Sequence, residues 1–277
     1  MKDETPLGAI SFAAFDLETT GMDPIRDRIL EVGVVIFQGE EVKETLQHLI
    51  NPEIPIPKEV QLIHGIADEM VAGKPRMGEI LPDLLTFLSP HVPVAHNASF
   101  DLSFLLAAAS ERGIPFSSMP VVDSCLLARH VFPEFTTYRL ESLAKKLGIK
   151  REQSHRALSD AMNCFSLFCR AIDRLPRRWE TTWGEFRTSF PGVFSVDFEA
   201  LALPEKFQPL EKAVRERSRL LLSYRDGQGE VTKRGVTPMG FVKEEGDRVL
   251  LVCYCHLRQG TRTFRLDRIL DIEMVTS

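Results

Sequence analysis

Two carboxylates stand one residue apart in the stretch FAAFDLETTG, residues 12–21, which is otherwise apolar and reads as a buried strand. Side chains alternate in direction along a strand, so Asp16 and Glu18 project from one face while Leu17 points the other way. Two carboxylates so close together repel, and one would take up a proton unless divalent cations keep both ionised. The pair indicates a metal site or, as the simpler alternative, two solvated acids at a strand end.

A third acid lies in AHNASFDLSFLLAAA, residues 95–109, where an apolar helical pattern begins. Asn97 or Ser99 can cap this helix, which places Asp101 in the first turn and on the same face as Leu105. A carboxylate on an apolar face needs a partner, and a metal would provide one. An equally good interpretation is a first-turn aspartate that complements the helix dipole.

A histidine and a fourth acid lie in SHRALSDAMNCF, residues 154–165. Five residues turn a helix by about 500°, which leaves His155 and Asp160 about 140° apart. They cannot share a helical face, so we expect His155 in the first turn or the loop before it. From there its ring can reach a site that Asp160 helps to form, although a lone histidine in such a place is usually a surface residue.

The elements that must position these residues follow from the periodicity of the apolar positions. Strands are predicted over residues 11–18, 29–37 and 42–50, where they form a meander, and over 92–96 and 119–123. Helices are predicted over residues 77–88, 99–113, 139–148 and 155–175. Strands that alternate with helices predict an α/β fold in which a mixed sheet is flanked by helices.

The four acids and the histidine, in this order, resemble the DEDDh (DnaQ-like) exonuclease family, which includes the proofreading epsilon subunit of bacterial DNA polymerase III. The likeness covers about residues 11–173 and rests on FDLETTGMDPIRDRILEVGVV, VAHNASFDLSFL and HRALSDA. A tyrosine-bearing sister group would place tyrosine four residues before the last aspartate. Arg156 holds that position here, so the histidine type is implied.

The resemblance implies a ribonuclease-H-like fold and hydrolysis of phosphodiester bonds by a two-metal mechanism. It implies two Mg²⁺ or Mn²⁺ ions as cofactors and His155 as the general base, a role that suits an imidazole near neutral pH. The implied metal ligands are Asp16, Glu18, Asp101 and Asp160.

The resemblance implies that the residues beside Asp16 and Glu18 contact the terminal nucleotide of the substrate. Three positions elsewhere in the chain are further candidates for substrate binding. For His64, in IHGIAD, a loop histidine bonded to backbone is an equally good interpretation, and Phe100 fits a core position as well. The candidate substrate-binding residues are Leu17, Thr19, Thr20, His64, Asn97 and Phe100.

The end of the chain has a different pattern, with a helix over residues 210–219 and short strands joined by glycine turns. This predicts a small β-barrel or sandwich. The stretch 209–277 resembles a WYL domain, an Sm-like barrel, although Arg248-Val249-Leu250 replaces the Trp-Tyr-Leu triplet that names that family. The resemblance implies binding of nucleic-acid strands or nucleotide-like ligands.

An anion-binding face is predicted for this module, because arginines, a histidine and a tyrosine together suit phosphate and base. The alternative is a solvated face on which the arginines pair with nearby acids. The candidate residues of this face are Tyr224, His256, Arg258, Arg262 and Arg265.

Length and charge support two modules. The chain has 277 residues and a net charge of -5, and its end from Glu211 onward has 13 basic and 10 acidic residues, or +3, which leaves -8 for the rest. A charge of +3 is far below a strong nucleic-acid footprint. The predicted boundaries are an exonuclease domain over 8–175, a packed linker over 176–208 that contains both tryptophans, and a WYL-like domain over 209–277.

We expect a cytoplasmic protein without membrane contact, because no apolar run reaches membrane-spanning length and the start MKDETPLGAISF is acidic. The five cysteines fit no metal spacing, and their odd number argues against a disulfide framework. The implied function is 3′-to-5′ exonuclease action on single-stranded 3′ ends, with DNA favoured and a polymerase or repair partner that the sequence does not name. The alternatives are an RNA-trimming exoribonuclease and a non-catalytic regulator that responds to nucleotides.

Overall fold

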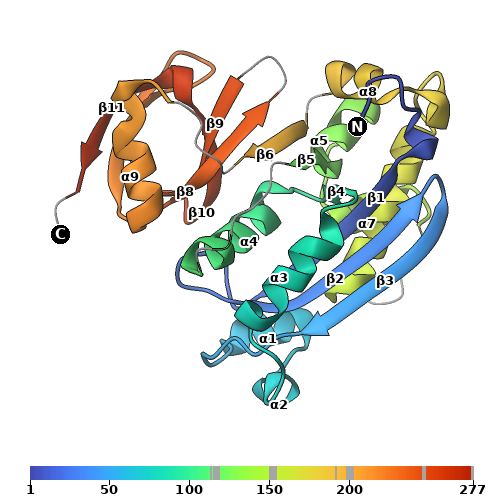
Figure 1. Ribbon diagram of the computed structural model, residues 1–277, viewed down its shortest axis with the longest axis horizontal. Coiled ribbons are helices and arrows are strands. Elements are labelled where there is room, and N and C mark those ends of the chain that lie inside the picture. The colour runs from blue at the N-terminus through green and yellow to red at the C-terminus, as the bar shows by residue number, and fades with distance from the viewer. Residues whose placement is uncertain are drawn as a thin grey trace. The chain divides into compact units, whose positions relative to one another are not determined.

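The computed structural model describes residues 1–112, 114, 119–149, 155–190, 192–197, 203–244 and 248–275 (Figure 1). Its contacts divide the chain into two compact units. The first unit consists of Met1–Thr20, Arg28–Asp101 and Pro120–Val193, and the second of Gly21–Asp27, Leu102–Met119 and Phe194–Ser277.

A five-stranded mixed sheet forms the centre of the first unit, in the order β5-β4-β1-β2-β3. The central strand β1 pairs antiparallel with β2 and parallel with β4, β5 continues parallel to β4, and β3 pairs antiparallel with β2. The apolar strands β1 and β2 are buried, whereas the charged strand β3 is largely exposed at the sheet edge. The strands are β1 Ser11–Thr19, β2 Ile29–Gln38, β3 Glu41–Leu49, β4 Val92–Ala95 and β5 Met119–Asp123.

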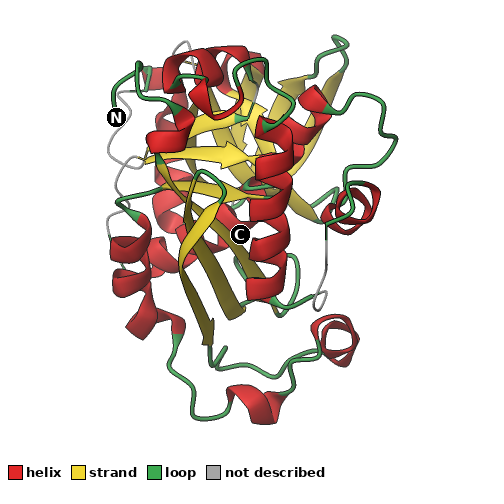
Figure 2. Ribbon diagram, turned by 90° about the vertical axis from the view of Figure 1, so that its right-hand side faces the viewer, coloured by secondary structure: helices red, strands yellow, loops and turns green. Residues whose placement is uncertain are grey.

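Helices cover this sheet, with α3 on the near side of the strands and α7 behind them in Figure 1; Figure 2 distinguishes the same elements by type. Aromatic side chains attach α7 to the sheet, because Phe168 packs on Phe12 of β1 and Phe165 on Phe37 of β2, with ring centroids 4.9 Å and 4.7 Å apart. The predicted mixed α/β fold is confirmed. The helices of this unit are α1 Lys58–His64, α2 Asp68–Val71, α3 Met77–Leu88, α5 Ser124–Val131, α6 Leu140–Lys146, α7 Ala157–Ile172 and α8 Trp183–Ser189. Helix α4, Ser99–Glu111, begins in this unit, and its residues from Leu102 onward belong to the second.

The first part of the predicted linker contributes to the core of the first unit. Trp183 and Phe186 of α8 are buried in the same cluster as Phe12 and Phe168, and Thr182 caps the helix through its hydroxyl. Residues up to Val193 belong to this unit by their contacts. A fragment that ended at residue 175 would therefore leave part of this core open.

The second unit contains an antiparallel sheet in the order β11-β7-β8-β9-β10, and β6 pairs with the end of β8. Helix α9, Gln208–Glu216, buries Leu210 and Ala213 in its core. No pairing joins β10 to β11 among the described residues, so the sheet is open there. The strands are β6 Val193–Asp197, β7 Leu220–Arg225, β8 Val231–Glu244, β9 Arg248–Cys255, β10 Gly260–Arg265 and β11 Ile269–Met274.

A 3-10 turn at Leu266–Arg268 separates β10 from β11. All five cysteines are free thiols. Within the described ranges, no helix combines the length and apolar character needed to cross a membrane.

Candidate metal centre

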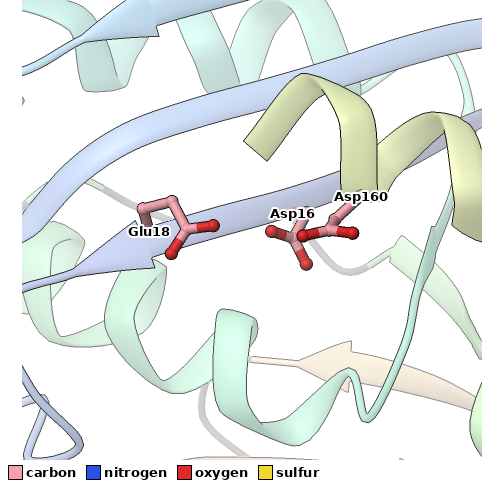
Figure 3. A group of neighbouring side chains, drawn as sticks. All are labelled: Asp16, Glu18 and Asp160. Atoms are coloured by element: carbon pink, nitrogen blue, oxygen red, sulfur yellow. The ribbon is translucent and has the colours of Figure 1, made fainter. Parts of the chain in front are cut away.

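β1 and α7 bring three of the predicted acids together. Asp16 and Glu18 project from β1, and Asp160 projects from the first turn of α7 (Figure 3). One carboxylate oxygen of each residue lies within 4.8 Å of those of the other two. All three side chains are partly buried, and we refer to them as the acidic cluster.

The carboxylate of Asp160 is held from two sides. Its Oδ2 accepts a hydrogen bond from the backbone N–H of His155 at 2.9 Å, and its Oδ1 accepts one from Asn163 Nδ2 at 3.2 Å. Asn163 is itself buried on α7. The direction in which Asp160 faces β1 is therefore fixed by its own helix and by the residue that precedes it.

Asp101 lies against β1 but outside the acidic cluster. It is only 3% exposed, in the first turn of α4, and its Oδ1 accepts a hydrogen bond from the backbone N–H of Leu17 at 3.1 Å. Leu17 separates the two β1 acids along the strand. The structure thus places Asp101 beside the cluster, with one oxygen bound to backbone.

The charges of these acids are poorly compensated. Burial, followed by the neighbouring charges of Asp101 and Glu18, raises the pKa of Asp16 well above its ordinary value. Burial also raises the pKa of Asp101. For Glu18, burial and the charges of Asp160 and Glu31 raise the pKa from 4.5 to about 8. Without a counter-ion, part of this site is protonated at neutral pH.

The donor set fits a hard divalent cation. Carboxylate oxygens are the ligands that Mg²⁺ and Mn²⁺ prefer, and no thiol or imidazole belongs to the acidic cluster. A bound cation would also remove the repulsion that raises these pKa values. The chemistry of the residues is therefore compatible with the predicted cofactors.

The raised pKa of Glu18 predicts how the stability of the metal-free protein depends on pH. The folded state binds the proton of Glu18 more tightly than the unfolded chain does. The protonated side chain therefore makes its full contribution to the free energy of unfolding below pH 4.5, and this contribution is lost as the pH rises through about 8. We expect the melting temperature in EDTA, measured as wild type minus Glu18→Gln, to fall over this window. The difference isolates Glu18 from His64 and His96, whose pKa values burial lowers. A difference that rises with pH would contradict the prediction.

Mn²⁺ should reverse this dependence, because the ion binds only the deprotonated carboxylates. A concentration one hundred times the dissociation constant should stabilise the folded state by about 2.7 kcal/mol. The same melting experiment with Mn²⁺ in place of EDTA measures this gain, which should be larger at pH 8 than at pH 6.

His155 occupies a left-handed backbone conformation, with φ of 58°, immediately before α7. This agrees with the expectation that it precedes the helix and does not share a face with Asp160. Its side chain is exposed, and its backbone N–H is the group bonded to Asp160. The main chain at His155 is thus tied to the acidic cluster through this hydrogen bond.

The residues beside the first two acids are buried. Leu17, Thr19 and Thr20 are 4%, 7% and 1% exposed. Thr20 closes the β1–β2 connection, since its N–H donates to the Arg28 carbonyl at 2.8 Å and its Oγ1 accepts from the Arg28 N–H at 2.9 Å. Side-chain atoms of these residues are therefore mostly enclosed by the fold.

Asn97 is exposed and has a left-handed backbone conformation, with φ of 67°. Its carbonyl accepts a hydrogen bond from the N–H of Phe100, a residue that is partly buried. Asp123 holds this turn. Its carboxylate accepts from the N–H groups of Asn97 and Ala98 and caps α5 through two further N–H groups. Sequence reasoning missed Asp123, although an aspartate between a strand and a helical pattern is an N-cap signal.

His64 ends α1 and is 4% exposed. Its Nδ1 accepts from the N–H of Ile66 at 2.9 Å, as the backbone-bonded interpretation requires, while Nε2 has no partner among the described residues. Burial lowers its pKa, so the ring is neutral and carries its proton on Nε2. The charges of Glu31, Arg156 and His155 also influence this ring.

The five residues proposed for the anion-binding face do not share one face of the second unit. Arg262 and Arg265 lie three residues apart on β10 and therefore project from opposite faces. Arg265 pairs with Asp267, and Tyr224 packs edge-on against Phe264. His256 Nε2 lies 2.8 Å from Thr237 Oγ1, and Arg258 is exposed in the β9–β10 turn.

A mixed sheet whose central strand presents clustered carboxylates defines a ribonuclease-H-like nuclease fold. The exonuclease family model, RNase_T, matches residues 13–168, more than half of the chain, so the chain belongs to this exonuclease family. The WYL domain model matches residues 205–274. Both resemblances found in the sequence are thus confirmed.

Known relatives agree with this assignment. DNA polymerase III subunit epsilon of Treponema pallidum is 41% identical over 165 residues, which cover 59% of this chain and 77% of that protein. The PolC-type DNA polymerase III of Caldanaerobacter subterraneus is 35% identical over 164 residues, 59% of this chain but only 12% of that polymerase. The solved nuclease domain of 3′hExo, a DEDDh family member bound to rAMP, has the same fold, with a TM-score of 0.53 and 18% identity over 62% of this chain and 94% of that domain.

Proposed function

We propose that the protein is a divalent-metal-dependent 3′-to-5′ exonuclease that releases nucleoside monophosphates from single-stranded ends. The observation that carries this proposal is the convergence of Asp16, Glu18 and Asp160 within 4.8 Å, on a strand and a helix of an exonuclease fold. Membership of the exonuclease family supports the reaction class. The alternative of a non-catalytic regulator is less favoured, because all five catalytic positions are filled.

The acidic cluster would hold the Mg²⁺ or Mn²⁺ ions, with Asp101 as the fourth acid beside it. Two bound ions would supply electrostatic stabilisation of the charge that develops on the phosphate. We assign His155 the removal of a proton from the attacking water. The water oxygen then bonds to phosphorus, the bond from phosphorus to the 3′ oxygen breaks, and that oxygen takes a proton from solvent.

Leu17, Thr19 and Thr20 would hold the terminal nucleotide mainly through backbone and methyl contacts, since they are nearly buried. Asn97 and Phe100 lie in the turn that begins α4, close in sequence to Asp101, and His64 offers a buried N–H. These six residues remain the candidate contacts for the substrate.

DNA is the favoured substrate, because the relative from Treponema pallidum is named as a DNA polymerase subunit. The same name supports a polymerase as a partner. RNA trimming is the second candidate, and the rAMP bound to the 3′hExo nuclease domain favours it. The choice depends on contacts with the 2′-hydroxyl group.

The second unit would be a nucleic-acid or nucleotide-binding module. Its match to the WYL domain supports the predicted Sm-like barrel and the predicted boundary near residue 209, although the sheet is open between β10 and β11 among the described residues. The free cysteines suit a reducing compartment, which supports the expected cytoplasmic location.

Digestion of 5′-labelled oligonucleotides by the full-length protein tests the proposal. We expect Mn²⁺ or Mg²⁺ to produce a ladder of progressively shorter labelled strands, because shortening begins at the 3′ end, and EDTA to stop the reaction. Matched DNA and RNA strands, single and double, give the substrate preference. Immediate release of the label as a mononucleotide, or the absence of digestion with either metal, would contradict the proposal.

A further inference from the structure

A buried carboxylate that is not a candidate ligand lies next to the acidic cluster. Glu31 is the third residue of β2, is fully buried, and stands directly opposite Glu18 in the strand pairing. The function proposed above gives it no role. A fully buried carboxylate in an otherwise apolar strand is costly unless several donors satisfy it.

Four hydrogen bonds satisfy Glu31. Its Oε1 accepts from Arg156 Nη2 at 2.6 Å and from Gln47 Nε2 at 2.8 Å. Its Oε2 accepts from Arg156 Nε and from the backbone N–H of Ala157, both at 3.0 Å. The pair with Arg156 is therefore bidentate, the geometry that fixes direction as well as distance.

These bonds fix the beginning of α7. Ala157 is its first residue, and the first N–H groups of a helix have no partner within the helix. Arg156, the residue before it, has an extended backbone and no side-chain cap of its own. Glu31 of the sheet thus takes the place of a local cap and ties the helix end to β2.

Gly33 allows the same helix end to approach the sheet. A Cβ at this position would overlap the backbone of Ala157 and Leu158. Gly33 is the strand partner of Asp16, so the first turn of α7 rests beside that acid. Asp160, three residues after Ala157, consequently faces Asp16 (Figure 3).

We propose that Glu31 is a positioning residue, which acts through Arg156 and the Ala157 N–H to set His155 and Asp160 against the acids of β1. The inference rests on the proposed function only for its effect on turnover. The effect of Glu31 on metal binding follows from the geometry of the acidic cluster alone. Asp160 comes from the beginning of α7, which Glu31 ties to β2, whereas the other two acids come from β1. Loss of the tether lets Asp160 move away from them.

The test compares Glu31→Gln and Arg156→Lys with wild type in the full-length protein. Glu31→Gln removes the charge at nearly constant size, and Arg156→Lys keeps the charge but loses the bidentate fork. We expect each to weaken Mn²⁺ binding, measured by calorimetry, by about 10- to 100-fold and to lower kcat by a similar factor, as is typical for residues that orient metal ligands. KM for the strand should change little, because neither side chain is placed in the substrate contacts.

Leu143→Ala is the matched control, because Leu143 is a fully buried core residue of the same unit on α6. It should lower the melting temperature without weakening Mn²⁺ binding at a temperature where all variants are folded by circular dichroism. A general loss of stability would therefore be separated from a loss of position. If Glu31→Gln does not fold, Arg156→Lys alone decides the question.

Wild-type Mn²⁺ affinity and kcat in the folded variants would overturn the inference. A wild-type protein that binds Mn²⁺ but digests no strand would contradict the proposed function, and the affinities of the variants would then decide the positioning role. A wild-type protein that binds no Mn²⁺ would contradict both.

Discussion

Asp16→Asn should abolish exonuclease turnover and leave the protein folded. The substitution keeps the size of the side chain on the central strand but removes a carboxylate that lies within 4.8 Å of both other members of the acidic cluster. Loss of one preorganised electrostatic group costs about 10²- to 10³-fold in rate, and a lost metal ligand adds to this. We expect kcat on a 5′-labelled single strand to fall on the order of 10³-fold or more.

The folded state of this variant should also become more stable in EDTA. Burial and neighbouring acids raise the pKa of Asp16, so its charge opposes folding when no metal is bound. Asp173→Asn is the matched control, since Asp173 pairs with Arg178 at the surface and lies outside the acidic cluster. Equal kcat in Asp16→Asn and wild type would remove Asp16 from the site.

His155→Ala should lower kcat by about 10²- to 10⁴-fold, the usual contribution of a general base, and leave measurable activity. Mn²⁺ affinity should remain close to wild type, because the backbone N–H of residue 155, which alanine retains, forms the hydrogen bond with Asp160. A loss of turnover without a loss of metal binding would separate the role of the ring from that of the turn.

Free imidazole in the assay provides the decisive measurement for His155. It should restore part of the activity of His155→Ala, whereas Asp16→Asn, which lacks a ligand and not a base, should not respond. A His155→Ala variant with wild-type kcat would contradict the assignment, and so would one that loses Mn²⁺ binding to the same extent as Asp16→Asn.

Most elements around the site could be predicted because their periodicity is strong. The strands that contain Asp16 and Glu31 are continuous apolar runs, and α7 has a clear amphipathic pattern over sixteen residues. Helix α5 was not predicted, since it has only eight residues and depends on the Asp123 cap. Strand order could not be read from the sequence either, because β4 and β5 pair through contacts distant along the chain.

The candidate site was predictable to a different degree for each residue. Alternation on a strand was sufficient to place Asp16 and Glu18 on one side. The hydrogen bond between Leu17 N–H and Asp101 was not predictable, because it depends on how α4 meets β1. Glu31 had a visible signal, a charge inside ILEVGVVIF, but its partner Arg156 is 125 residues away. Distance along the chain hides such a pair from any local pattern.

Main-chain contact at Gly33 makes the position of Asp160 unusually sensitive to events elsewhere in α7. Where a strand and a helix meet through side chains, small rotamer adjustments can absorb a displacement of one against the other. Here the backbone of Ala157 and Leu158 fills the space beside Gly33, so no side chain lies between strand and helix to absorb a displacement. Repacking near Phe165 or Phe168 that slides the helix would therefore displace Asp160 by a similar amount. The aromatic contacts of α7 with β1 and β2 thus help to set the distance between Asp160 and the acids of β1.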